Sequence, residues 1–122
     1  MSKTCLVVDD SRVVRKVARR ILEDLHLSVE EAADGKLAFE ACQRQMPDAV
    51  LLDWDMPVMN GLEFLKLLRA APGGEAPLVV FCTSHSELDH IQQAINAGAN
   101  EYIMKPFDGD ILEAKMIQVG LL

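Results

Sequence analysis

Five short, mainly apolar runs alternate along this chain with segments that have a longer hydrophobic period. The runs are TCLVV (4–8), SVEEA (28–32), AVLL (49–52), LVVF (78–81) and YIM (102–104). Unbroken apolar runs of this length are typical of strands buried on both faces of a parallel sheet. The second run is more polar than the others, which favours a place at the edge of that sheet.

The intervening segments have the spacing of helices. Residues 11–25 place Val14, Ala18, Ile21 and Leu25 at steps of three and four. Helix-capping residue types precede the later segments, at Asp34, Asn60, Ser86 and Asp108. We therefore expect one α/β domain over residues 1–122, a flavodoxin-like doubly wound (βα)5 fold with five parallel strands in the order 2-1-3-4-5.

Composition excludes several classes of protein. Half of the 122 residues are hydrophobic, which is enough for the chain to fold alone. No apolar run approaches the roughly 18–20 residues that span a bilayer, and the early acidic residues are unlike a signal peptide. The net charge of −7 disfavours DNA binding. The three cysteines, Cys5, Cys42 and Cys82, lack metal-ligand spacing and are expected to be reduced. Reduced cysteines favour a location in the cytoplasm.

Polar residues follow the ends of four runs. They are Asp9 and Asp10 after the first run, Asp53 after the third, Thr83 after the fourth and Lys105 after the fifth. With the strand order 2-1-3-4-5, the crevice at the switch in strand order lies between the first and third strands. The three carboxylates must then crowd together, which is unstable unless a cation joins them. Carboxylate oxygens favour Mg²⁺, and we expect one ion per domain.

The same edge of the sheet contains the groups needed to phosphorylate a carboxylate. Asp53 is a nucleophile, Lys105 supplies a compact positive charge and Thr83 supplies a hydroxyl donor. Phosphoryl transfer depends on positioning and charge neutralisation more than on covalent help. A single aspartate after a strand is usually a turn or capping residue, but here each polar group ends a different strand. We therefore expect Asp53 to be the reactive group.

Four spaced motifs point to a family. The segments VVDDS (7–11), LLDWDMPVMNG (51–61), CTS (82–84) and MKPF (104–107) resemble the receiver domain of two-component response regulators. The similarity extends over essentially the whole chain, and we expect no output domain. The chain is therefore similar to stand-alone, CheY-like receivers of the chemotaxis type.

The resemblance implies a role for each polar residue. Asp53 is the expected phosphoacceptor, Thr83 contacts the phosphoryl group and Lys105 pairs with it. The expected ligands of Mg²⁺ are Asp10 and Asp53 directly, Asp9 through water, and the backbone carbonyl of Asp55.

Further positions follow from the same resemblance. Thr83 and the aromatic Tyr102 are the expected switch residues, which move together on phosphorylation. Asp55 and His85 occupy positions that tune the lifetime of the phosphoryl group. The bond before Pro106 is expected to be cis.

The family also implies partners. A histidine kinase or histidine phosphotransferase supplies the phosphoryl group, and a downstream protein binds the phosphorylated form. Passing the phosphoryl group onward in a phosphorelay is the alternative role. We expect a monomer, with dimerisation on activation left open, and no membrane insertion. The domain is not expected to be an enzyme, because it has no free substrate to turn over.

The first predicted helix is strongly basic, and its role is open. Its cationic residues are Arg12, Arg15, Lys16, Arg19 and Arg20. They form either a solvated face paired with Glu23 and Asp24, or a docking surface for the kinase, with Arg12, Arg15 and Arg19 as the candidates. Steering of an anionic ligand such as a cyclic nucleotide is a third possibility.

Three rival classes share parts of the pattern. A haloacid-dehalogenase-type phosphatase uses an Asp-x-Asp nucleophile like DWD at 53–55, but there this motif follows the first strand. A flavodoxin-like FMN binder would need a phosphate-binding loop after the first strand, where this chain has two aspartates. A protein-interaction module with an inactive site would lack one of the central residues, and none is missing.

Overall fold

The computed structural model describes residues 3–84 and 88–122, in which strands and helices alternate along the chain. The strands are β1 (Thr4–Val8), β2 (Ser28–Ala32), β3 (Ala49–Asp53), β4 (Leu78–Thr83) and β5 (Glu101–Met104). The helices are α1 (Arg12–Asp24), α2 (Gly35–Arg44), α3 (Gly61–Ala70), α4 (Leu88–Asn96) and α5 (Gly109–Gln118).

The five strands form one parallel sheet in the order β2-β1-β3-β4-β5. The predicted fold and strand order are confirmed, and the polar run SVEEA forms β2 at one edge of the sheet. In this register Val8 pairs with Leu52 and Asp53 pairs with Cys82. The carboxyl ends of β1, β3 and β4 therefore lie side by side.

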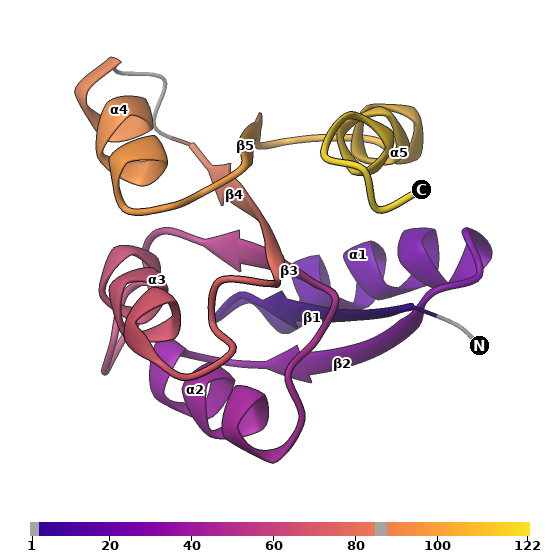
Figure 1. Ribbon diagram of the computed structural model, residues 1–122. Helices are drawn as coiled ribbons and strands as arrows, with labels where there is room; N and C mark the ends of the chain where they lie inside the picture. Colours follow the sequence, from indigo (N-terminus) through magenta and orange to yellow (C-terminus); the bar gives the residue numbers. More distant parts are fainter. Residues whose placement is uncertain (1–2, 85–87) are drawn as a thin grey trace.

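Two hydrophobic cores lie on opposite faces of the sheet. Leu6 and Val8 of β1 point into the core covered by α2, α3 and α4, whereas Cys5 and Val7 point into the core covered by α1 and α5. Figure 1 shows α1 and α5 on the right, with the other three helices on the left. Both faces of the central strands are covered, which is why their sequences are unbroken apolar runs.

Most element boundaries follow the expected signals. The side chains of Asp34, Asn60 and Asp108 accept hydrogen bonds from the first turns of α2, α3 and α5, as predicted. The expected cap at Ser86 lies outside the described residues. Strand β4 is two residues longer than its apolar run and includes Thr83, which pairs with Met104 of β5. A β-branched residue suits this buried strand position.

The cysteines are free thiols inside the cores. Cys5, Cys42 and Cys82 are buried and form no disulfide with one another. Burial raises the pKa of Cys42 to about 11 and the pKa of both Cys5 and Cys82 to about 12. These groups therefore stay protonated at neutral pH and act as packing residues. Across residues 3–84 and 88–122, every helix is too short or too polar to cross a membrane.

Candidate functional site: an acidic cluster with a shared lysine

The sheet topology brings three carboxylates together at one edge. Asp9 and Asp10 follow β1, Asp53 ends β3, and one oxygen from each of the three lies within 4.8 Å of the others. Asp9 and Asp53 are buried, whereas Asp10 is exposed to solvent. The crowding of carboxylates expected from the strand order is therefore present in the structure.

Lys105 joins two of these carboxylates. Its Nζ lies 2.8 Å from Oδ2 of Asp9 and 3.0 Å from Oδ1 of Asp53. The backbone amide of Lys105 donates to the carbonyl of Thr83 at 2.9 Å, which ties the lysine to the end of β4. The Lys105–Pro106 peptide bond is cis, the conformation that the resemblance implies. One ammonium group thus neutralises part of the charge of two buried acids.

Asp9 is held by hydrogen bonds on every side. Its Oδ1 accepts from the backbone amide of Ser11 at 2.8 Å, and its Oδ2 accepts from Lys105. Its own amide donates to the carbonyl of Ala32 in β2 at 3.1 Å. Because both carboxylate oxygens already accept hydrogen bonds, Asp9 is better suited to hold a metal through water than directly.

Burial sets the protonation behaviour of the site. Burial raises the pKa of Asp53 to about 6, the hydrogen bond from Lys105 opposes this, and the charges of Asp9 and Asp10 add to the increase. The pKa of Lys105 is raised above its ordinary value, because the carboxylates of Asp9 and Asp53 outweigh the burial that disfavours its charge. At neutral pH Asp53 is therefore ionised, which is the state a nucleophile or metal ligand requires.

This pKa predicts a pH-dependent gain in stability for Asp53→Asn. The folded state binds a proton at Asp53 more tightly than the unfolded state, so ionisation of this group destabilises the fold as pH rises from 3.8 to about 6. Without Mg²⁺ at pH 7, we expect Asp53→Asn to increase the free energy of unfolding by about 1–2 kcal/mol. Urea unfolding measures this gain in stability, which should vanish near pH 4. An equal gain at pH 7 and pH 4 would contradict a raised pKa of Asp53.

The switch candidates occupy neighbouring strands. Thr83 is buried at the end of β4, and Tyr102 is half-buried on β5. Register pairs Phe81 with Tyr102 and Thr83 with Met104, so Thr83 and Tyr102 lie on the same face of the sheet, toward α4. The amino group of Lys115 lies 5.3 Å from the centre of the Tyr102 ring. Their joint movement on phosphorylation stays a prediction.

The tuning candidates are only partly described. Asp55 is exposed in the loop after β3, and its carboxylate is not part of the acidic cluster found among the described residues. The backbone carbonyl of Asp55 is the group expected to bind Mg²⁺, and this role stays a prediction. His85 lies outside the described residues.

The structure confirms Glu23 as a partner of the basic helix and adds Glu31, which was not expected. Arg15, Lys16 and Arg19 all pair with Glu31 of β2, at 3.1, 2.9 and 2.6 Å. Of the two expected acids, Glu23 pairs with Arg19 at 3.4 Å. The neighbouring-turn partners were proposed from helical spacing alone. Glu31 was missed because its distance from α1 along the sequence does not reveal which strand the helix covers. The available signal was an acidic residue in a strand that is otherwise half-buried.

Trp54 links the acidic cluster to the helical layer. It follows Asp53 directly and is buried, with its ring 4.9 Å from Phe81 of β4 and 5.1 Å from His90 of α4, centre to centre. It is also the single tryptophan of the chain. Its fluorescence should therefore report on the site alone.

Comparison with known proteins assigns the family. The family model described as the response regulator receiver domain matches residues 5–117. The chain belongs to this family. The receiver is 34% identical to chemotaxis protein CheY-3 of Vibrio cholerae over 115 residues, which cover 93% of this chain and 88% of that protein.

Another curated relative is longer than this chain. The receiver is 40% identical to response regulator MprA of Mycolicibacterium vanbaalenii over 111 residues, 91% of this chain. These residues cover 47% of MprA, so the chain spans about half the length of that relative.

Solved structures have the same fold. Chemotaxis protein CheY4 of Vibrio cholerae matches with a TM-score of 0.93 and 30% identity, over 98% of this chain and 99% of that one. A CheY-like receiver domain protein from Methanospirillum hungatei matches with a TM-score of 0.87 and 28% identity, over 98% and 94%. The family and these structures support a receiver over the phosphatase and FMN-binding alternatives.

The donor set of this receiver suits Mg²⁺, which the family binds at an acidic pocket. Three aspartates provide hard oxygen ligands within 4.8 Å of one another, and two of them, Asp9 and Asp53, form ion pairs with Lys105. Asp10 and Asp53 are the residues that would hold the ion directly, with Asp9 as the ligand through water.

Proposed function

We propose that this receiver accepts a phosphoryl group on Asp53 from a histidine kinase or histidine phosphotransferase, in a Mg²⁺-dependent reaction. The phosphorylated form then signals by binding a target protein. The observation that carries this proposal is the Lys105 ammonium, which lies between Asp9 and Asp53 beside a third carboxylate. A merely structural ion pair would not need the second and third acids.

The chain's own residues support an in-line transfer. An oxygen of ionised Asp53 attacks phosphorus, the bond from phosphorus to the donor nitrogen breaks, and its electron pair returns to the imidazole, which takes a proton from water. Lys105 stabilises the charge on the phosphoryl oxygens, and the hydroxyl of Thr83 is the expected donor on the other side. Bound Mg²⁺ supplies further neutralisation of the same charge. The domain would catalyse only its own phosphorylation and dephosphorylation, so we do not class it as an enzyme.

The surface beside Lys105 is suited to the phosphodonor protein. A groove is lined by Lys105 together with Val13, Val17 and Phe107, and Val13 is 72% exposed. This apolar surface is continuous with the phosphorylation site, because Lys105 belongs to both. Arg12 is exposed at the start of α1, next to Val13. We propose that this surface docks the donor.

The other two candidate docking residues are engaged elsewhere. Arg15 and Arg19 point their guanidinium groups at Glu31. Their proposed contribution to docking is therefore smaller than that of Arg12, and reversing Arg12 to Glu should slow transfer from a kinase without affecting a small donor. Equal slowing with both donors would count against docking.

We favour a CheY-like role in the cytoplasm, in which the phosphorylated receiver binds a target. The support is that the chain covers 88% of CheY-3 and 99% of CheY4. Recovery of the phosphoryl group on a histidine phosphotransferase, rather than phosphorylation-dependent target binding, would instead favour the phosphorelay role.

The emission of Trp54 provides the direct test of phosphorylation. We expect Mg²⁺ to change the emission and beryllofluoride or acetyl phosphate to change it again, because Trp54 adjoins Asp53. Asp53→Asn should lose the second change and gain no phosphoryl group by mass spectrometry. The matched control is Asp55→Asn, two residues away, which should still be phosphorylated. Folded wild-type protein that responds to neither addition would overturn the proposal.

A further inference from the structure

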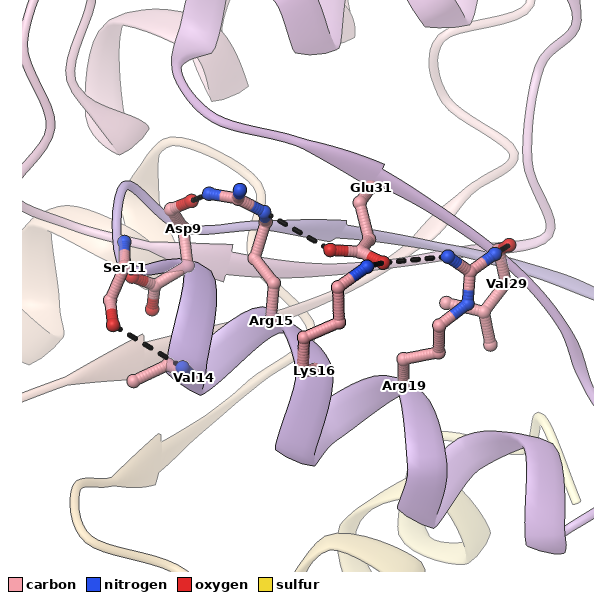
Figure 2. A network of polar contacts seen from close by, with 8 residues as sticks. All are labelled: Asp9, Ser11, Val14, Arg15, Lys16, Arg19, Val29 and Glu31. Atoms are coloured by element: carbon pink, nitrogen blue, oxygen red, sulfur yellow. Dashed lines mark hydrogen bonds and ion pairs between the residues drawn. The ribbon is translucent and has the colours of Figure 1, made fainter.

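The guanidinium group of Arg15 connects the acidic cluster to β2. Its Nη1 donates to the backbone carbonyl of Asp9 at 2.7 Å, and its Nε donates to Oε1 of Glu31 at 3.1 Å. Figure 2 shows the side chain of Arg15 extended between these two acceptors. The planar fork of arginine holds two acceptors in a fixed relative geometry, which a lysine cannot do.

The carbonyl that Arg15 binds belongs to the peptide between the two adjacent aspartates. The amide of Asp9 is held by Ala32, and its carboxylate is held by Ser11 and Lys105. With the bond from Arg15 to its carbonyl, every polar group of Asp9 has a hydrogen-bond partner. The carbonyl is also the group that orients the next peptide unit. Because a peptide unit is planar, the direction of this carbonyl also sets the position from which the Asp10 side chain starts.

Arg15 is itself held by a fixed anion. Glu31 accepts hydrogen bonds from Arg15, Lys16 and Arg19, and its side chain is 13% exposed. Burial opposes the charge of Glu31, but these three hydrogen bonds hold its pKa below the ordinary value. Arg19 also donates to the carbonyl of Val29, so Glu31 is clamped to its own strand. Figure 2 shows the three cations converging on this one carboxylate.

We infer that Arg15 is a positioning residue for the metal site, which fixes the Asp9–Asp10 peptide so that both carboxylates face Asp53. Glu31 supports it from β2. This inference rests on the proposed function and names residues beyond the acidic cluster on which its metal affinity depends. It also gives Arg15 a role directed into the site, in addition to the smaller contribution to docking proposed for this residue.

Magnesium affinity, measured by the emission of Trp54, tests the inference. Outer residues that orient metal ligands typically contribute about 10–100-fold in affinity, so Arg15→Ala is expected to weaken Mg²⁺ binding about tenfold. Lys16→Ala is the matched control, because Lys16 pairs with the same Glu31 but lies one residue away from the contact with Asp9. It should change the affinity less than about twofold.

The conservative variant Arg15→Lys separates positioning from charge. It keeps the positive charge but cannot reach both acceptors with a rigid fork, so its Mg²⁺ affinity should stay several-fold below wild type. Urea unfolding of each variant establishes that it is folded at the temperature of the titration. If Arg15→Ala does not fold, Arg15→Lys provides the comparison with Lys16→Ala.

The outcomes separate this inference from the proposed function. Suppose that the wild type binds Mg²⁺ and accepts a phosphoryl group, and that Arg15→Ala or Arg15→Lys binds Mg²⁺ as tightly as Lys16→Ala does. This result would overturn the positioning role and leave the proposed function intact. Wild-type protein that binds no Mg²⁺ would overturn both. A selective loss of affinity in the Arg15 variants supports the inference.

Discussion

Lys105→Ala is expected to slow phosphorylation of Asp53 by acetyl phosphate about 100-fold. The ammonium group lies 2.8 Å from Asp9 and 3.0 Å from Asp53, where it can neutralise charge that develops on the phosphoryl group. Removing a single preorganised electrostatic partner of this kind typically costs about 10²–10³ in rate. The rate is measured from the change in Trp54 emission at saturating Mg²⁺.

The same variant should bind Mg²⁺ more tightly than wild type. Lys105 and the metal are both cations that face the carboxylates of Asp9 and Asp53, so removing one charge relieves its repulsion of the other. A slower reaction combined with tighter metal binding cannot arise from simple misfolding. It would assign Lys105 to the transfer step.

Lys115→Ala is the matched control for Lys105→Ala. Lys115 is also a partly buried lysine with a carboxylate partner, 3.6 Å from Glu101, but it lies on α5 away from the acidic cluster. We expect it to leave both the rate and the Mg²⁺ affinity close to wild type. An unchanged rate in Lys105→Ala would remove the lysine from the proposed mechanism.

Gly61→Ala is expected to destabilise the fold by about 3 kcal/mol and to weaken Mg²⁺ binding. A Cβ atom at this position would overlap the backbone oxygen of Asp53 and approach the ring of Phe81 to 2.8 Å. The amide of Gly61 also donates to the carbonyl of Trp54 at 2.9 Å, which folds the loop back against the end of β3. Relief of the overlap must therefore move the strand end that carries Asp53.

Gly109→Ala provides the control for this substitution. Gly109 is the first residue of α5 after its capping aspartate, as Gly61 is the first residue of α3 after its capping asparagine. The nearest atoms to a Cβ at Gly109 belong to Ile21 at 3.8 Å, an ordinary contact distance. We expect this variant to be neutral or up to about 0.5 kcal/mol more stable, because alanine is the better helix former.

Urea unfolding of the two glycine variants distinguishes close packing from helix propensity. Equal stabilities for Gly61→Ala and Gly109→Ala would show that the backbone at Gly61 can relax without displacing Asp53. A loss confined to Gly61→Ala, together with weaker Mg²⁺ binding, would show that the start of α3 packs directly against the acidic cluster.

The sequence by itself determined the strands, their approximate limits and the edge of the sheet where the polar residues meet. This was possible because apolar runs buried on both faces are a local signal, and because parallel strands bring their carboxyl ends to one edge. The positions of Asp9, Asp10, Asp53 and Lys105 after their runs therefore predict that the four residues lie together. The structure brings them within hydrogen-bonding or metal-binding distance.

The pairing of α1 with Glu23 follows from helical spacing, whereas its pairs with β2 depend on how the helix packs on the sheet. Packing of α1 on the sheet directs Arg15 to Glu31 and to the Asp9 carbonyl. Arg19 keeps the acid of the next turn, Glu23, and gains Glu31 as a second partner. The contact between Gly61 and Asp53 was equally absent from the sequence pattern. Hydrophobic periodicity reports which face of an element is buried, whereas ion pairs and close backbone contacts depend on the direction and separation of groups on different elements.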